Sequence, residues 1–423
     1  MKKTLSRRGF LGGAVAATAG LSVIGTFPRA GHAEEGVVKV GVITPMTGDV
    51  AGWGLPALHG AEIWAETVNA RGGLTVGGDS YKVEILGWDD EFLAAKALTG
   101  AKKLVDEDGV SFIVMLGSTP VKAVQPYFNQ NEMISVTTVA SDLSPDSPFL
   151  LSTGESHPFY IPTSVDWMAQ NDPSLKKVAI LAQDDELGIP SVVTYKLAFD
   201  LNGVEVVHEN LFPIETLDFA PIISAALAAK PDLLCFDTSY PDFMNLMIEE
   251  AYLQGFRGKM ISVTLDNYDR LIEKTSKEFL EGFVFLFPDF DDSRMAESDI
   301  NFEDAAGYYR LYNERHPGTW SAQSWTYSAM LQVWKAGVEA AQSINPPDVL
   351  AALKGMNPAP HIFGPAKWWG KDVFGIDNVL IGHWPVVQMQ NGKAKFVAMG
   401  DVAGWLDKNQ DELIKRLKDV GSV

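Results

Sequence analysis

The chain is constrained most by a repeated alternation of strand and helix patterns, which begins at residue 37. The stretch from Val37 to Gly73 opens with a β-branched run, breaks at Thr44-Pro45, and enters an apolar-periodic helix from Leu55 to Val68. This is the first half of a βαβ unit. In open α/β sheets ligands bind beyond the carboxyl ends of the strands. Trp53, in the loop after the first strand, is therefore the first candidate site residue.

The same alternation continues along the chain. Strand and helix patterns follow in turn at residues 81–88, 94–105, 111–116, 121–128 and 133–136. Alternation of this kind predicts a parallel sheet covered by helices on both faces. The alternation fails at residues 141–164, where Ser, Pro, Asp and Gly are dense. It resumes at residues 178–287, where a helix is expected over residues 271–279. We therefore predict an α/β fold with two Rossmann-like parallel-sheet lobes.

The last third of the chain has a different pattern. An acidic, proline-marked break at residues 288–299 precedes two helical patterns, and strand patterns at residues 364–369 and 383–397 follow. The second of these contains Asn391-Gly392, a strong hairpin signal. Residues 405–417 predict a closing amphipathic helix. Since these late helices have no strands of their own to cover, we expect them to pack on the first lobe.

The chain must then cross between the lobes more than once, which makes a hinge. The two breaks in the alternation set the boundaries that we predict. Lobe 1 is expected to comprise residues 36–153 plus 288–370, and lobe 2 residues 154–287 plus 371–423.

Residues 1–33 are predicted to be an export signal. Lysines and arginines open the chain, residues 10–24 are small or apolar, and Gly31-His32-Ala33 places small residues where a peptidase needs them. The stretch Ser6-Arg7-Arg8-Gly9-Phe10-Leu11 resembles the twin-arginine export motif, which implies a bacterial chain that is exported already folded. We expect cleavage after Ala33 and a periplasmic location. An uncleaved N-terminal anchor is the alternative.

Charge and cysteine content exclude several classes of partner. Residues 1–33 hold five basic and no acidic side chains, so the net charge of −20 becomes −25 in the mature chain. An acidic surface of this size argues against nucleic acid and anionic lipid as partners. The single cysteine, Cys235, lies in an apolar run and is expected to be buried packing.

No catalytic or metal-binding signature is present in the sequence. The chain has no phosphate loop, no H-E-x-x-H, no C-x-x-C and no G-x-S-x-G motif. Its seven histidines show no metal-ligand spacing. We therefore expect no enzyme activity, no cofactor and no metal. An exported enzyme with a Rossmann-like fold stays open as an alternative.

Small hydroxyl residues follow two neighbouring strands of the first lobe. Ser118 and Thr119 stand directly before a helix, and Thr137 and Thr138 follow the next strand. Hydroxyls at a helix start serve as caps, and the same geometry aims backbone N–H groups at an anion. Two such loops side by side are suited to a carboxylate, with plain helix capping as the alternative.

The equivalent edge of the second lobe offers acids and aromatic residues. Asp185, Tyr240 and Asp266 each lie in a loop at a strand end. Carboxylates that face a cleft bind an ammonium group, and aromatic rings line an apolar pocket. Solvated loop acids and ordinary rim packing are the alternatives.

Together these segments resemble the solute-binding proteins of branched-chain and hydrophobic amino acid ABC importers. Residues 40–48 match that family's opening strand and turn, and residues 54–62 and 69–73 match its first helix and the Gly-Gly exit. The likeness runs over nearly all of residues 37–400. It implies a type I periplasmic binding fold, in which two lobes are joined by a three-strand hinge and close on one small ligand.

The resemblance also implies roles for the candidate residues of the first lobe. Trp53 corresponds to a loop aromatic beside the ligand side chain. Ser118 and Thr119 fall in the loop that binds the ligand carboxylate. Thr137 and Thr138 lie in the second carboxylate and ammonium loop.

In the second lobe Tyr240 corresponds to a ligand-contacting group, and Asp266 to the acid that pairs with the ammonium. The sequence departs from the family pattern at three places, one of which is Leu151-Ser152-Thr153-Gly154 in place of the family's Arg-Thr entry to the second lobe. Val139 stands where the family has a threonine that contacts the head group, and Leu187 replaces the usual aromatic. The departures argue against a plain α-amino acid, and Trp53 together with Val139 shifts the expected ligand toward something bulky or aromatic.

These observations predict a binding protein that captures a small carboxylate-bearing ligand and delivers it to ABC permease subunits. The ligand is expected to be an amino acid, an aromatic acid or another small organic acid, and the protein a monomer. A ligand sensor that reports to a membrane receptor is the alternative within the same fold.

Overall fold

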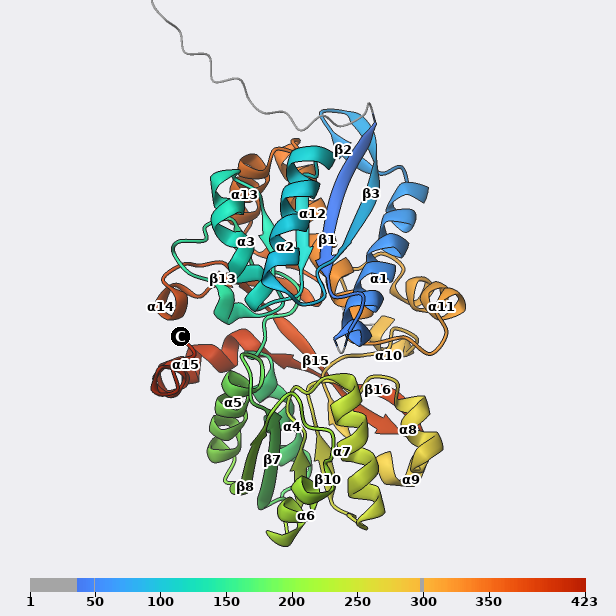
Figure 1. The fold of residues 1–423 in the computed structure, drawn as a ribbon, viewed down its shortest axis with the longest axis vertical. Coiled ribbons are helices and arrows are strands. Elements are labelled where there is room, and N and C mark those ends of the chain that lie inside the picture. Colours follow the sequence, from blue (N-terminus) through green and yellow to red (C-terminus); the bar gives the residue numbers. More distant parts are fainter. Residues whose placement is uncertain (1–35, 49, 297–299) are drawn as a thin grey trace, which may run out of the picture. The chain divides into compact units, whose positions relative to one another are not determined.

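A computed structural model describes residues 36–48, 50–296 and 300–423 of the chain (Figure 1). The predicted export signal at residues 1–33 lies outside the described residues. The described elements build two lobes, each around one sheet, as the alternation predicts. None of the helices in these ranges is both long and apolar enough to cross a bilayer.

Lobe 1 contains a six-stranded sheet. In spatial order its strands are β2 (Leu74–Val76), β3 (Asp79–Asp89), β1 (Val37–Thr44), β4 (Phe112–Met115), β5 (Ser135–Val136) and β6 (Leu150–Leu151). All neighbours are parallel except β2, which returns on β3 through the tight Gly77-Gly78 turn. The sheet is therefore mixed, where a purely parallel one was predicted. β6 falls in the stretch that showed no periodicity, because a two-residue strand has none.

Helices cover both faces of this sheet (Figure 1). Packed together on one face are α1 (Ala51–Ala70), α11 (Ala305–Arg315), α12 (Gln323–Ala341) and α13 (Pro346–Gly355), and on the other α2 (Ala94–Lys102) and α3 (Thr119–Gln130). β1 is inaccessible over most of its length, which accounts for its unbroken β-branched run. Two short helical turns, η1 (Lys103–Asp108) and η2 (Ala140–Asp142), follow α2 and β5.

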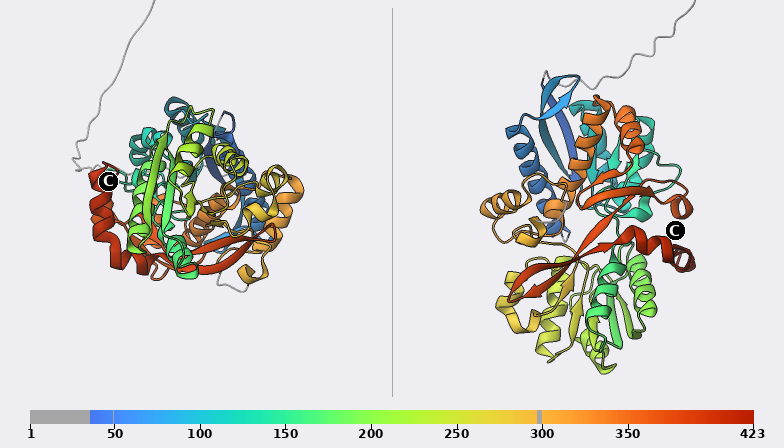
Figure 2. Two further views of the ribbon diagram at one scale, coloured as in Figure 1. Left: turned by 90° about the horizontal axis from the view of Figure 1, so that it is seen from below. Right: turned by 180° about the vertical axis from the view of Figure 1, so that it is seen from behind.

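Lobe 2 contains a seven-stranded sheet. In spatial order its strands are β16 (Lys393–Asp401), β15 (His383–Gln390), β11 (Val284–Phe285), β10 (Lys259–Ile261), β9 (Leu233–Cys235), β7 (Lys177–Gln183) and β8 (Glu205–Phe212). Five strands are parallel, and the antiparallel hairpin β15–β16 extends the edge (Figure 2). Asn391 and Gly392 take φ values of 54° and 74°, so the predicted hairpin is confirmed.

The helices of lobe 2 correct two expectations. They are α4 (Ile161–Asn171), α5 (Gly188–Leu201), α6 (Ala220–Ala228), α7 (Pro241–Leu253), α8 (Tyr268–Lys274), α9 (Lys277–Leu280) and α15 (Val402–Asp419). The helix predicted over residues 271–279 is split, because Ser276 accepts a hydrogen bond from the Phe279 N–H and starts α9. The closing helix α15 packs on α4 and α5 of lobe 2. The predicted bounds assign residues 371–423 to that lobe, whereas the lack of strands for this helix to cover favoured packing on lobe 1. Leu406, Leu413 and Leu417 of α15 are buried there, and Arg416 adds a partly exposed ion pair with Asp200 of α5 at 2.6 Å.

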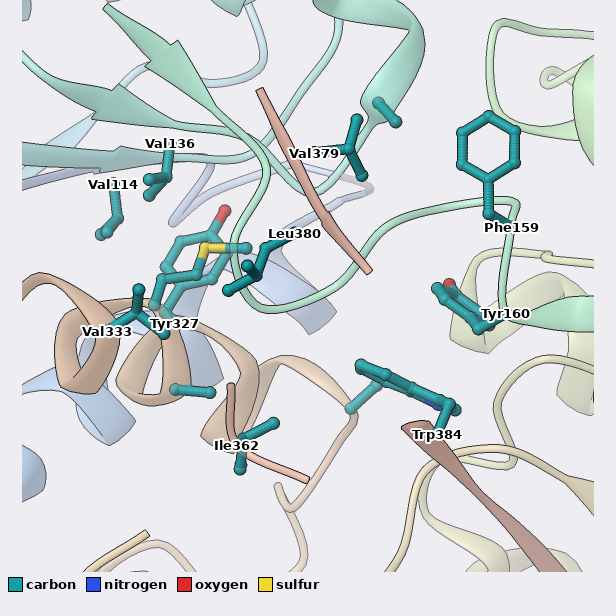
Figure 3. Packing of buried hydrophobic residues seen from close by; sticks show 14 of the residues in the cluster. Val114, Val136, Phe159, Tyr160, Tyr327, Val333, Ile362, Val379, Leu380 and Trp384 are labelled. Atoms are coloured by element: carbon teal, nitrogen blue, oxygen red, sulfur yellow. The ribbon is translucent and has the colours of Figure 1, made fainter. Parts of the chain in front are cut away.

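A third, three-stranded sheet lies where the chain crosses between the lobes. It consists of β12 (Ala359–His361), β13 (Gly364–Trp369) and β14 (Val379–Ile381), and the short helices α10 (Ser293–Ala296) and α14 (Lys371–Phe374) flank this region in sequence. Ser152 bridges to Val379, and the Trp384 indole donates to the Leu286 carbonyl at 2.8 Å. Tyr160 stacks on Trp384 at 4.8 Å between ring centroids (Figure 3). Three separate crossing segments thus share one buried core.

Candidate functional site

Each sheet has a point where the order of strands reverses. From β1 the chain passes to β3 on one side and later to β4 on the other, and in lobe 2 it passes from β7 to β8 and then to β9. The crevice beyond the carboxyl ends of such strands is the usual ligand position in open α/β sheets. The candidate residues of both lobes lie in or next to the loops at these ends.

Trp53 lies in the first turn of α1. The loop before it is held by Asp89 at the end of β3, which accepts hydrogen bonds from the Met46 N–H at 2.8 Å and the Thr47 hydroxyl at 2.7 Å. The Trp53 ring meets the Tyr240 ring edge-on at 5.1 Å. Its Nε1 donates to Asp266 Oδ2 at 3.0 Å. This lobe 1 side chain therefore contacts two predicted site residues of lobe 2.

Asp266 follows β10 and is almost completely buried. Its Oδ2 accepts from Trp53, and its Oδ1 accepts from the Ala322 N–H at the start of α12, at 2.7 Å. Burial raises the pKa of this carboxyl to about 6, against the opposing effect of both hydrogen bonds. The acid that the resemblance pairs with a ligand ammonium thus links the two lobes through internal hydrogen bonds.

A small apolar cluster joins the lobes beside this link. It consists of Trp53, Val139, Leu187 and Tyr240, all buried, with Val50 and Phe243 packed against it. Val139 and Leu187 are two of the departures from the family pattern. The apolar replacements therefore lie together, in contact with the predicted aromatic residues.

The hydroxyls of Ser118 and Thr137 share one buried acid that the sequence analysis missed. Ser118 Oγ donates to Asp142 Oδ1 at 2.7 Å, and Thr137 Oγ1 donates to Asp142 Oδ2 at 2.8 Å. Burial raises the Asp142 pKa to about 6, although Lys122 lies 3.9 Å away. Since each hydroxyl has one proton, both protons are committed to Asp142. The signal available in the sequence was an acid five residues after Thr137 in a hydroxyl-rich loop.

Thr119 and Thr138 are the chain neighbours of these two hydroxyl residues. Thr119 Oγ1 donates to Glu186 Oε1 of lobe 2 at 3.0 Å, in an exposed contact. Thr138 is buried, and its carbonyl accepts from the His157 N–H at 3.3 Å.

Asp185 accepts at Oδ1 from the Leu187 and Gly188 N–H groups, both at 2.9 Å, and so caps the start of α5. Its Oδ2 accepts from the Tyr240 hydroxyl at 3.3 Å. Burial raises the Asp185 pKa. The two backbone N–H groups hold the Asp185 carboxylate in place, and this carboxylate in turn positions the Tyr240 hydroxyl.

The stability of the protein is expected to increase as the pH falls from about 8 to about 5. Burial raises the pKa of Asp142 and Asp266 to about 6, of Glu155 and Asp289 to about 7, and of Asp237 to about 8. Their folded pKa values exceed the unfolded ones, so these five acids make the folded state bind more protons in this range. They outnumber the buried His157 and His361, whose pKa burial lowers to about 4 and which oppose the trend below about pH 6.5. The stabilisation is complete near the unfolded pKa of about 4 and is lost as the pH rises through the folded values.

Thermal unfolding between pH 8 and pH 5 measures this effect. The Asp237→Asn variant, which cannot ionise, should show a weaker dependence at the upper end of the range. A melting temperature that falls on acidification from pH 8 to pH 5 would contradict the assignment of these buried acids.

The described residues contain no group of three His, Cys, Asp or Glu side chains arranged to hold a metal ion.

Comparison with known proteins identifies the family. The model of the periplasmic binding protein family matches residues 37–394. The chain belongs to this family. As a periplasmic binding protein it has the α/β fold with two lobes that the resemblance implied, and its family serves transport.

Relatives and solved structures agree with this assignment. The chain is 27% identical over 240 residues to the Leu/Ile/Val-binding protein homolog 3 of Brucella melitensis, a match that covers 54% of this chain and 61% of that relative. A leucine-binding protein from Thermotoga maritima is 21% identical, with a TM-score of 0.68 over 86% of this chain and 99% of that chain. An ABC transporter solute-binding protein from R. palustris in complex with 4-hydroxybenzoate is 21% identical, with a TM-score of 0.69 over 87% and 98%. At these identities the structural matches establish the fold of this periplasmic binding protein.

Proposed function

We propose that this protein is the substrate-binding component of an ABC importer and captures a small carboxylate-bearing ligand by closure of two lobes. The observation that carries the proposal is the contact of Trp53 with Asp266 and Tyr240, which joins the switch-point loops of both lobes. A ligand that interacts with both lobes at once favours the closed state through its differential affinity. The moving units would be residues 36–153 plus 288–370 and residues 154–287 plus 371–423.

The ligand class is an amino acid or an aromatic or other small organic acid. Solved structures of similar fold include a leucine-binding protein and a complex with 4-hydroxybenzoate, and both ligands carry a carboxylate. Trp53, Val139 and Tyr240 supply apolar surface for the remainder of such a ligand. The Ser118 side chain does not cap α3, so the N–H groups of its first turn are suited to the carboxylate, with Thr119 and Thr138 beside them.

The proposed function also requires export of the chain and a membrane partner. Export through the twin-arginine-type signal, with cleavage near Ala33, would place the mature chain in the periplasm as a monomer that docks on ABC permease subunits. We assign it no catalytic step, cofactor or metal.

A thermal-shift screen followed by calorimetry tests the proposal. The purified mature chain is screened against the twenty amino acids, hydroxybenzoates and short keto acids. At least one acid is expected to bind with one site per chain and a micromolar or tighter dissociation constant, about −8 kcal/mol or better. The proposal fails if no acid raises the melting temperature, and a nucleotide or flavin that does so would favour an exported enzyme instead.

A further inference from the structure

A cavity of about 180 Å³ adjoins the interlobe link at Asp266 and Ala322. It lies between the loop after β10, the segment after β11, and the region from α11 to the start of α12. Its lining is unusually aromatic and includes Tyr268, Phe287, Tyr309, Trp320 and Trp325. The volume far exceeds the ~10–15 Å³ that one water needs, so a small organic group fits there.

The buried charge of this cavity is negative. Asp266 and Asp289 both line it and are only 6% and 5% exposed. The Tyr268 hydroxyl donates to Asp289 Oδ2 at 2.6 Å. The two other charged residues of the lining, Asp269 and Arg270, are exposed. Burying a carboxyl without a partner cation is costly, and among the described residues no lysine or arginine forms an ion pair with Asp289, although Arg270 lines the cavity and Lys393 lies beside Tyr268.

A second observation also indicates that a ligand belongs in this space. Ser321 lines the cavity and is only 2% exposed, yet its hydroxyl has no hydrogen-bond partner among the described residues. Buried polar groups are nearly always paired in native proteins. A hydroxyl left unpaired beside a cavity is therefore typical of a site that is completed by a bound molecule.

Aromatic rings and carboxylates together favour one class of ligand. The quadrupole of an aromatic ring attracts cations within about 6 Å of its centroid, and such rings recognise alkylated ammonium groups. The chain already uses this attraction at the cavity, because the Lys393 ammonium lies 5.9 Å from the centroid of the Tyr268 ring. Lys393 itself is exposed and stands 3.8 Å from Asp269.

We propose that this cavity binds the ammonium or alkylated ammonium group of the transported ligand, with Asp289 as its counter-ion. The inference rests on the proposed function and narrows it, because the ligand would be an acid that also carries a cationic group. Asp266 accepts hydrogen bonds from Trp53 and Ala322 at its two oxygens. Asp289 is assigned the counter-ion role because it lies beside the Tyr268, Tyr309 and Trp320 rings, and Asp266 lines the same cavity.

Binding of a cation in this cavity is expected to weaken as the pH falls from about 8 to about 6. Burial raises the pKa of Asp289 to about 7, the Tyr268 hydrogen bond opposes this, and Asp291 and Asp269 raise it further while Lys393 lowers it. Tyr309 also lies against this carboxyl and titrates well above this range. Protonation of Asp289 removes the charge that attracts the ligand.

Choline and 3,3-dimethylbutan-1-ol form a matched pair of probes, because they have the same shape and differ in charge. Each is titrated into the full mature chain by calorimetry. Choline is expected to bind at least about tenfold more tightly than the neutral alcohol. The Asp289→Asn variant keeps an acceptor for the Tyr268 hydroxyl and should lose that preference. The Asp291→Asn variant, at an exposed neighbouring acid, should keep it.

Equal binding of the two probes, no binding of choline, or an unchanged preference in Asp289→Asn would each overturn the cation site. These outcomes are separate from a failure of the proposed function. An aromatic acid without a cationic group that binds wild type and Asp289→Asn equally would refute the cation site and leave acid capture standing. Binding of choline without any acid would support the cavity and refute the carboxylate-bearing ligand.

Discussion

Replacing Gly54 with alanine is expected to lower the free energy of unfolding by about 3 kcal/mol. A Cβ atom at this position would lie 1.6 Å from the Pro45 carbonyl oxygen and 3.0 Å from the Thr44 hydroxyl. The nearest obstacle is backbone, at the end of β1, and it cannot rotate away as a side chain would. The first turn of α1 would have to move, and Trp53 would move with it. Urea unfolding followed by circular dichroism measures the loss.

Gly52 in the same turn of α1 is the matched control. A Cβ atom there would meet only the Pro241 ring, at 3.9 Å, which is an ordinary contact. Alanine is favoured over glycine inside a helix by up to about 1 kcal/mol. The Gly52→Ala variant should therefore unfold at the same or a higher urea concentration than wild type. Equal destabilisation of both variants would show that the approach of β1 to α1 is not the cause.

The Trp53→Ala variant is expected to bind the ligand found in the acid screen about 30-fold more weakly, a loss of about 2 kcal/mol. The change removes the ring that contacts Tyr240 and the indole N–H that donates to Asp266. It therefore removes the apolar contact and the hydrogen bond that join the lobes at this point. Calorimetry with purified protein measures the affinity, and circular dichroism confirms that the variant is folded.

Two further variants separate the loss of the Trp53 ring from the loss of its hydrogen bond, and both from a general loss of stability. Trp53→Phe keeps an aromatic ring near Tyr240 but loses the bond to Asp266, so its affinity should lie between those of wild type and Trp53→Ala. Trp64, on the same helix, donates to Gln332 of α12 within lobe 1. Trp64→Phe should lower stability and leave affinity nearly unchanged. A folded Trp53→Ala variant with wild-type affinity would remove Trp53 from the site.

Much of the fold could be predicted because its long elements carry clear periodicity. β1 is buried and β-branched, and the hairpin turn at Asn391-Gly392 has a specific backbone requirement. The errors in the predicted fold occur where the local sequence carries no periodic signal. A two-residue strand such as β6 has no period, and the Ser276 cap between α8 and α9 depends on one hydrogen bond. Where α15 packs is decided by tertiary partners such as Asp200.

The candidate site was predictable to a similar extent. The rule that ligands lie beyond strand ends pointed to Trp53, Tyr240 and Asp266, and the family resemblance pointed to Val139. The structure brings these four together. Their contacts with a ligand stay predictions.

The sequence did not reveal that Asp142 takes the protons of Ser118 and Thr137, or that Asp289 faces a cavity. Both facts depend on contacts between separate segments of the folded chain. A strand-end rule names the loops that meet at a site, but it does not say which of their polar groups are already paired with each other.

Small-angle X-ray scattering of the mature protein with and without a saturating acid from the screen tests the central claim most directly. Closure of two lobes on one ligand predicts a smaller radius of gyration in the ligand-bound state, with no change when a non-binding acid is added. An unchanged radius of gyration at full saturation would contradict capture by lobe closure.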